Sequence, residues 1–144
     1  MKIFIDCEFN GFEGELLSLA LVADDGKEFY EVLFHPFIKY EDWVKEHVVP
    51  ILNKETVTKT FYQHKLQKFL WQYDEIHLIA DWPDDIKYFC MSLITGPGIC
   101  LNTPPITMEI NRNLSTEKSA ILHNALEDAR AISKSYHSLK GAIS

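Results

Sequence analysis

Apolar and polar positions along this chain divide it into short strands and longer helices. Compact apolar runs rich in β-branched and aromatic residues are typical of strands, whereas charged residues mixed with apolar ones at helical spacing indicate helices. Strands are expected around Ile3 to Ile5, Leu16 to Ala23, Glu28 to Phe34, Ile76 to Ala80 and Ile99 to Leu101. Helices are expected at Glu41 to Val49, at Lys59 to Tyr73, from Pro83 through Leu93, and from about Asn124 to Leu139, the last after a Pro-bearing loop through Asn113.

The order of these elements predicts a mixed α/β fold. Asp24-Asp25-Gly26 indicates a turn between the second and third strands, so the N-terminal strands should form an antiparallel meander. Helices then alternate with strands, which predicts a central sheet with helices on both faces. At 144 residues, with no repeat and no linker-like tract, residues 1–144 are expected to form a single domain.

Two carboxylates interrupt the first apolar strand, within the run from Ile3 to Asn10. Residues i and i+2 of a strand point to the same face, so Asp6 and Glu8 should stand side by side. Like charges held close in a partly dry site raise each other's pKa unless cations lie between them. The pair therefore indicates a divalent-metal site, although a solvated strand end with two unconnected acids would also fit it.

A second group of polar residues lies near the C-terminus. If a helix begins near Asn124, Asp128 lies about one turn into it and His123 lies just outside or in the first turn. A carboxylate and a titratable imidazole would then face one site. Taken alone, this spacing also fits an exposed helix start with a histidine near its cap.

A third acidic cluster follows the strand that ends at Ala80, and it contains Asp81, Asp84 and Asp85. Pro83 suits the first turn of a helix, and acids suit the positive N-terminal end. Since acids at such an end normally act as caps and dipole partners, at least one of the three is expected to do only that.

The order of these motifs resembles the DEDDh family of 3′-5′ exonucleases. The chain is similar to a small bacterial and phage exoribonuclease branch, related to ribonuclease T and oligoribonuclease, over nearly its whole length. The segments that carry the resemblance beyond the first motif are Glu15-Leu16-Leu17-Ser18, Trp43-Val44-Lys45-Glu46-His47-Val48, and His123 to Ala129. The resemblance implies a ribonuclease-H-like fold.

The resemblance also implies roles for particular residues. Asp6, Glu8 and Asp128 would be metal ligands, and His123 would be the general base. Glu8 would also lie near the attacking water and the terminal hydroxyl. Phe9 follows the first motif and could stack on the terminal base, although a phenylalanine is more often part of a core.

The middle acid of the family pattern is less clearly assigned. Asp85 is the expected ligand because Tyr88 and Phe89 follow it at the family's spacing. However, Asp84 stands where the family has an aromatic residue. Asp81, at the strand end, is the rival.

The chemistry of these residue types agrees with the resemblance. Two Mg²⁺ or Mn²⁺ ions can activate a water and stabilise the leaving oxygen of a phosphodiester, and such hard ions prefer carboxylate oxygens. An imidazole can accept a proton near neutral pH. By resemblance, the site would release a nucleoside 5′-monophosphate from the 3′ end of a nucleic acid.

Composition limits the kinds of nucleic acid that this chain is expected to bind. The net charge of −7 argues against a long basic groove, so short single-stranded or overhanging ends are favoured, with RNA preferred over DNA by resemblance. The resemblance also implies a homodimer. Asp6 interrupts the first apolar run, so a signal peptide is not expected. No apolar stretch predicts a membrane span, and we therefore expect a cytoplasmic location. Cys7, Cys90 and Cys100 are expected as buried free thiols.

The sequence therefore predicts a metal-dependent 3′-5′ exoribonuclease with two ions per site. A non-catalytic member of the same fold that binds RNA or a protein is the main alternative. A metal-dependent phosphodiesterase acting on small nucleotides is a third, which the acidic composition would suit.

Overall fold

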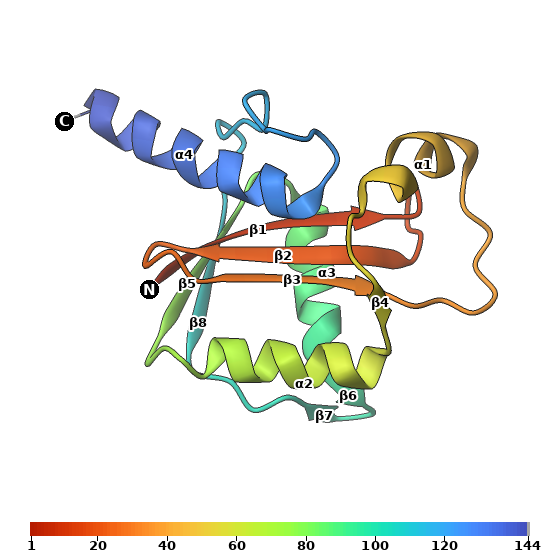
Figure 1. Cartoon of the computed structure of the whole chain (residues 1–144). Helices are drawn as coiled ribbons and strands as arrows, with labels where there is room; N and C mark the ends of the chain where they lie inside the picture. The colour runs from red at the N-terminus through yellow and green to blue at the C-terminus, as the bar shows by residue number, and fades with distance from the viewer. Residues whose placement is uncertain (144) are drawn as a thin grey trace.

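The computed structural model describes residues 1–143, with side chains described as far as residue 141. Its centre is a six-stranded sheet in the order β4-β3-β2-β1-β5-β8 (Figure 1). The strands are β1 (Lys2–Phe9), β2 (Leu16–Ala23), β3 (Glu28–Leu33), β4 (Thr56–Val57), β5 (Ile76–Ala80) and β8 (Ile106–Ile110). A separate two-stranded sheet pairs β6 (Ile94–Gly96) with β7 (Ile99–Cys100).

Helices cover both faces of the large sheet. They are α1 (Asp42–His47), the short 3₁₀ helix η1 (Val49–Ile51), α2 (Lys59–Leu70), α3 (Pro83–Leu93) and α4 (Ala125–Ile143). In Figure 1, α4 lies along the opposite side of β1 and β2 from α2 and α3. The α/β architecture with helices on both faces is the one that the sequence predicts.

The pairing of the strands makes the sheet mixed. β1, β2 and β3 pair antiparallel, which confirms the expected meander, whereas β1 with β5, β5 with β8 and β3 with β4 pair parallel. β1 therefore has an antiparallel neighbour on one edge and a parallel neighbour on the other. This arrangement is consistent with a ribonuclease-H-like fold.

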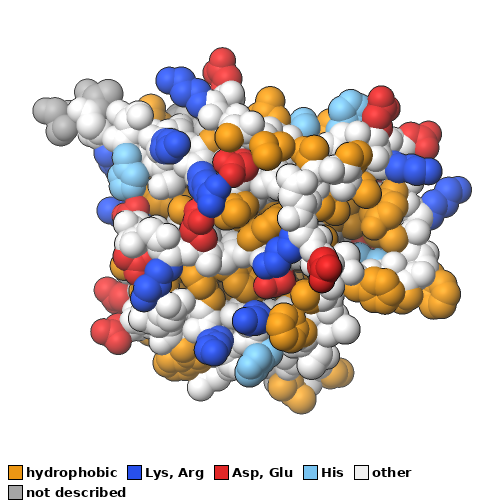
Figure 2. Space-filling view, viewed as in Figure 1, with side chains coloured by type: hydrophobic (Ala, Val, Ile, Leu, Met, Phe, Trp, Pro, Cys, Tyr) orange, Lys and Arg blue, Asp and Glu red, His pale blue; other side chains and the backbone are white. Residues whose placement is uncertain are grey.

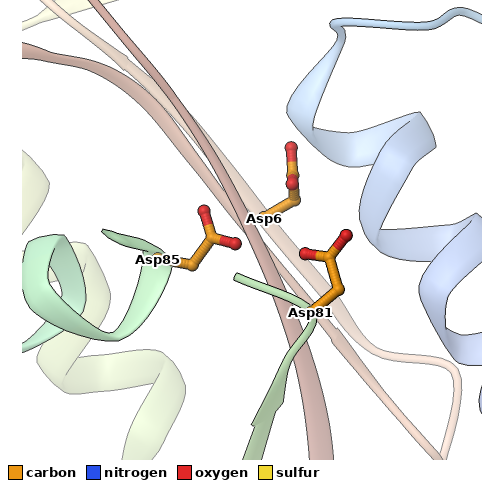
Figure 3. Close-up of side chains that lie close together, drawn as sticks. All are labelled: Asp6, Asp81 and Asp85. Carbon is orange, nitrogen blue, oxygen red and sulfur yellow. The ribbon is translucent and has the colours of Figure 1, made fainter. Parts of the chain in front are cut away.

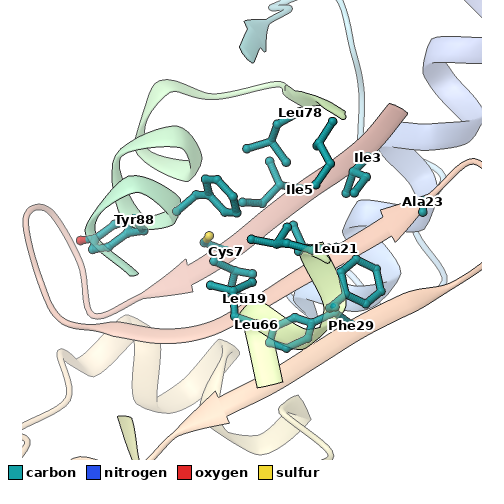
Figure 4. Packing of buried hydrophobic residues seen from close by; sticks show 14 of the residues in the cluster. Ile3, Ile5, Cys7, Leu19, Leu21, Ala23, Phe29, Leu66, Leu78 and Tyr88 are labelled. Carbon is teal, nitrogen blue, oxygen red and sulfur yellow. The ribbon is translucent and has the colours of Figure 1, made fainter. Parts of the chain in front are cut away.

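Alternate residues of β1 enter two different cores. The side chains at odd positions of β1 pack with β2, α2 and α3, as Figure 4 shows for Ile3, Ile5 and Cys7. On the other face, Phe4 packs against Ile132 and Tyr136 of α4. Because strand side chains alternate, Asp6 and Glu8 lie on the same face as Phe4, below α4.

Several details differ from the sequence prediction. β1 continues to Phe9, so its two acids lie within the strand and not at its end. The segment Ile106–Ile110, expected in a loop, forms the edge strand β8. All three cysteines are free, but only Cys7 is buried, Cys90 is partly exposed and Cys100 is exposed. Within the described part of the chain, no helix has the length and apolar character needed to cross a membrane.

Candidate metal centre and active site

Small residues allow α4 to approach the strand that carries Asp6 and Glu8. Opposite Asp6 on β2 lies Ala20, which is buried in one cluster with Ala125 and Ala129 of α4. Because these three side chains are single methyl groups, the helix can lie close to the sheet here. The first turn of α4 is thereby brought over the two carboxylates of β1.

The start of α4 is fixed by residues just before it. The side-chain oxygen of Asn124 accepts a hydrogen bond from the Glu127 N–H at 3.1 Å, and its amide nitrogen donates to the Ile51 carbonyl at 2.9 Å. His123 has a φ of 72°, and its backbone N–H donates to Oδ2 of Asp128 at 3.1 Å. This left-handed turn orients the Asp128 carboxylate toward β1.

Asp81 and Asp85 occupy the place where β1 and β5 separate. The two strands pair only as far as Phe4 and Ile79, after which the chain of β5 turns into α3. Asp85, in the first turn of α3, accepts a hydrogen bond on Oδ1 from the Cys7 backbone N–H at 3.1 Å. The carboxylate thus binds an edge amide of β1 that β5 no longer reaches. It is 2% exposed.

The five carboxylates form two groups that share Asp6. One oxygen each from Asp6, Glu8 and Asp128 lies within 4.8 Å of the others, and so does one oxygen each from Asp6, Asp81 and Asp85. Figure 3 shows the second group, in which the three carboxylates converge from β1, the end of β5 and α3. Two cation sites joined by one common acid would suit this arrangement.

The electrostatics of the group are strongly unfavourable without cations. Burial raises the pKa of Glu8 to about 9, and the charges of Asp128 and Asp85 add to that effect. Burial likewise raises the pKa of Asp85 to about 8, followed by the charge of Asp81. The pKa of Asp6 lies well above its usual range, because of burial first and then the charge of Asp85.

Unpaired oxygens in this cluster fit a metal. Among the described side chains, Asp6, Asp85 and Asp128 each have one buried carboxylate oxygen with no hydrogen-bond partner. In Asp85 and Asp128 the other oxygen is held by a backbone N–H. Buried polar atoms are rarely left unpaired, and carboxylate oxygens are the preferred ligands of Mg²⁺ and Mn²⁺, so the residues present suit such ions.

The imidazole of His123 lies beside this cluster in an aromatic setting. Its ring meets the ring of Trp43 edge-on, with centroids 4.9 Å apart and an interplanar angle of 80°. Trp43 also stacks on His47 at 4.8 Å. Trp43 therefore holds the His123 ring from the side of α1.

A pocket of about 370 Å³ opens next to Glu8. It is lined by Glu8, Phe9, Gly11, Phe12, Glu41, Trp43 and Val44. Gly11 has a φ of 75°, a backbone conformation that favours glycine, and the carboxylate of Glu41 lies over its Cα. The pocket has aromatic walls and two acids.

Phe9 combines the two environments expected for it, a contact with the core and a position beside the site. Its ring stacks on Tyr88, with centroids 4.9 Å apart, and packs against the core on the α3 side. Phe9 is also one of the residues that line the pocket beside Glu8. Whether Phe9 contacts a substrate base stays a prediction.

The structure brings the predicted acids Asp6, Glu8, Asp85 and Asp128 together, with Asp81 among them and His123 next to Asp128. Asp81 and Asp85 stand in the same carboxylate group, so the choice between them as the middle ligand stays open. Sequence reasoning gave no role to Trp43 or Glu41. The signal for Trp43 was present, since it lies in one of the segments that carry the family resemblance.

Comparison with known proteins identifies two similar proteins. No family model matches the chain. Two proteins from strains of Mycobacterium tuberculosis, both named 3′-5′ exoribonuclease, are each 28% identical to it over an alignment of 151 residues. The alignment covers 90% of this chain and 88% of the relative. The chain is thus similar, at low identity and nearly full length, to proteins named as 3′-5′ exonucleases.

Proposed function

We propose that this protein is a DEDDh-type 3′-5′ exoribonuclease that uses two Mg²⁺ or Mn²⁺ ions to release nucleoside 5′-monophosphates from single-stranded or overhanging RNA ends. The observation that carries the proposal is the pair of three-carboxylate groups sharing Asp6. The names of the relatives support the polarity and the RNA substrate. Asp6, Glu8, Asp128 and Asp85 would hold the ions, with Asp81 as the alternative or additional ligand.

The side chains of the site would have different roles in the reaction. Divalent ions held by these acids would activate the attacking water and stabilise the leaving oxygen. His123 would take the proton of that water, and Trp43 would keep the imidazole ring in place. Glu8, between the carboxylate cluster and the pocket, would orient the terminal nucleotide through its sugar hydroxyl.

The pocket beside Glu8 would receive the 3′-terminal nucleotide. Aromatic side chains provide stacking surfaces for a base, which here are those of Phe12 and Trp43, with exposed fractions of 86% and 52%. The carboxylates of Glu8 and Glu41 are hydrogen-bond acceptors suited to hydroxyl or amino groups. Its volume of about 370 Å³ suits one nucleotide and not a chain that passes through it.

We further propose that the active protein is a homodimer. Large apolar side chains on the surface support this, among them Phe34, Phe37, Phe61 and Ile99. On the face shown in Figure 2, Lys and Arg side chains lie among Asp and Glu side chains. Because acidic side chains are mixed with the basic ones there, we expect a second subunit to supply some of the positive charge that binds RNA. Light scattering of an active preparation should show about twice the chain mass of 16.7 kDa, and a monomer alone would contradict it.

A degradation assay tests the proposed function directly. Purified protein is incubated with 5′-labelled RNA and with DNA of the same sequence, in Mg²⁺, in Mn²⁺ or in EDTA. The expected result is a ladder that shortens from the 3′ end of the RNA, nucleoside 5′-monophosphates as products, and no reaction in EDTA. An intact substrate under all metal conditions would favour the non-catalytic alternative, and full activity in excess EDTA would exclude the metal mechanism.

A further inference from the structure

A cation, Arg112, stands beside the carboxylate cluster and close to the acid Asp81. Arg112 follows β8, and its Nη1 donates to the backbone carbonyl of Asp81 at 2.6 Å. Among the described residues it forms no salt bridge, whereas Lys54, Lys87 and Arg130 each pair with a carboxylate. Most of the five N–H donors of Arg112 thus remain available to an anion.

The neighbouring tryptophan packs against this guanidinium. The guanidinium carbon of Arg112 lies 4.4 Å from the centroid of the Trp82 ring. The indole N–H of Trp82 in turn donates to Oδ2 of Asp84 at 3.0 Å, which holds the ring at the start of α3. A guanidinium stacked on an aromatic face loses little conformational freedom when it binds a ligand.

The position of Arg112 relates it to the path of a substrate. The pocket beside Glu8 is walled by α1, which packs on β2 and β3 through Val44. Arg112 instead follows β8, on the other side of β1, and donates to the carbonyl of Asp81, the residue that follows β5. A strand whose 3′-terminal nucleotide fills the pocket and whose last phosphodiester lies over Asp6 would leave the site toward Arg112.

We propose that Arg112, stacked on Trp82, binds the phosphate immediately 5′ of the scissile one. This inference rests on the proposed exonuclease function and adds a substrate contact to it. It explains how a chain with a net charge of −7 can hold a short RNA end, because one preorganised guanidinium replaces a basic groove. The enzyme should therefore prefer substrates that carry at least one phosphate upstream of the cleaved bond.

The test compares two substrates that differ in that phosphate alone. A dinucleotide with a free 5′ hydroxyl has only the scissile phosphate, whereas the 5′-phosphorylated dinucleotide also has the upstream one. For the wild-type protein, KM should be about tenfold lower for the phosphorylated form, as expected for a charge-assisted hydrogen bond. Arg112→Ala should bring the ratio of the two KM values close to one, and Arg112→Lys should restore part of it.

Controls separate this contact from folding and from the proposed function. Lys118→Ala removes an exposed cation from the same connection and should leave the KM ratio as in the wild type. For a longer single-stranded RNA, Arg112→Ala should lower the slope of log KM against log salt by about 0.7, which is the loss of one phosphate contact. Thermal unfolding of each variant checks that it remains folded.

The outcomes are distinguishable. If the wild type cleaves RNA but Arg112→Ala keeps the full KM ratio, Arg112 does not bind the upstream phosphate. The same conclusion follows if both dinucleotides lose rate equally. If the wild type cleaves neither RNA nor dinucleotides with either ion, the proposed function itself fails.

Discussion

At the scale of single residues, backbone amides determine where the acids of this site lie. Asp85 accepts a hydrogen bond from a backbone N–H of β1, Asp128 accepts one from the turn just before its own helix, and each keeps one oxygen unpaired. Such a bond fixes the orientation of a carboxylate without neutralising its charge. The acids are therefore positioned for cations before any cation binds.

The middle ligand can be identified by substitution. Asp85→Asn should reduce kcat/KM by more than about 100-fold, because losing a ligand costs more than losing an outer-shell partner. Asp81→Asn should have a smaller effect, since Asp81 is less buried and lies beside the charge of Arg112. Steady-state kinetics with Mg²⁺ measures both. An inactive Asp81→Asn with an active Asp85→Asn would exchange the two assignments.

The role of His123 can be separated from metal binding. His123→Ala should lower the single-turnover rate by about 100-fold or more, as expected for loss of a general base. Metal affinity, measured by calorimetry, should stay close to that of the wild type because the ring is not among the clustered ligand atoms. The pH dependence of the rate should also change shape. Trp43→Leu leaves the imidazole but removes the ring that packs against it. Its single-turnover rate should therefore lie between those of the wild type and His123→Ala.

At the scale of elements, the hydrophobic pattern was sufficient where an element is buried and insufficient at the sheet's edges. The pattern predicts β2, β3, β5 and α3 within a residue or two, because their apolar residues enter the core. β8 was missed because it is an edge strand with several exposed side chains that follows Pro104 and Pro105. β4 has only two residues, too few for a periodic signal.

The N-terminus of α4 offers a test at this scale. Asn124→Ala removes the side-chain cap and the bond to the Ile51 carbonyl, and should lower the free energy of unfolding by about 1–2 kcal/mol. Because Asp128 lies in the first turn of α4, metal affinity should fall as well. Denaturant unfolding and metal titration measure the two effects. Asn124→Ser keeps a capping oxygen and should retain more of both, and equal losses in the two variants would exclude capping as the cause.

At the scale of the whole molecule, the site is assembled from segments that are distant in sequence. Asp6, Glu8, His123 and Asp128 could be predicted because each belongs to a short motif with a recognisable spacing. Glu41 and Arg112 could not be given roles, because only the packing of α1 and the course of the chain after β8 bring them to the site. A contact between residues that are distant in sequence produces no periodic pattern from which it could be predicted.

The concentration of buried acids should make stability depend on pH and metal together. The folded-state pKa values of Glu8 and Asp85, about 9 and about 8, exceed their ordinary values of 4.5 and 3.8. Between the ordinary and the raised values, the folded protein binds more protons than the unfolded chain. The free energy of unfolding of the metal-free protein should therefore fall as pH rises through this range.

Thermal unfolding in EDTA and in Mg²⁺ tests this coupling. In EDTA, Tm should fall steadily from about pH 5 to about pH 9, since burial of ionised acids without cations destabilises the fold. In Mg²⁺ the fall should be largely removed, because the ions bind the ionised carboxylates of the folded state. Glu8→Gln should show a shallower fall in EDTA and a smaller gain from Mg²⁺, as one titrating acid and ligand is gone. A Tm that rises with pH in EDTA, or that ignores Mg²⁺ at the alkaline end, would show that these five carboxylates are not held together as a cation site in solution.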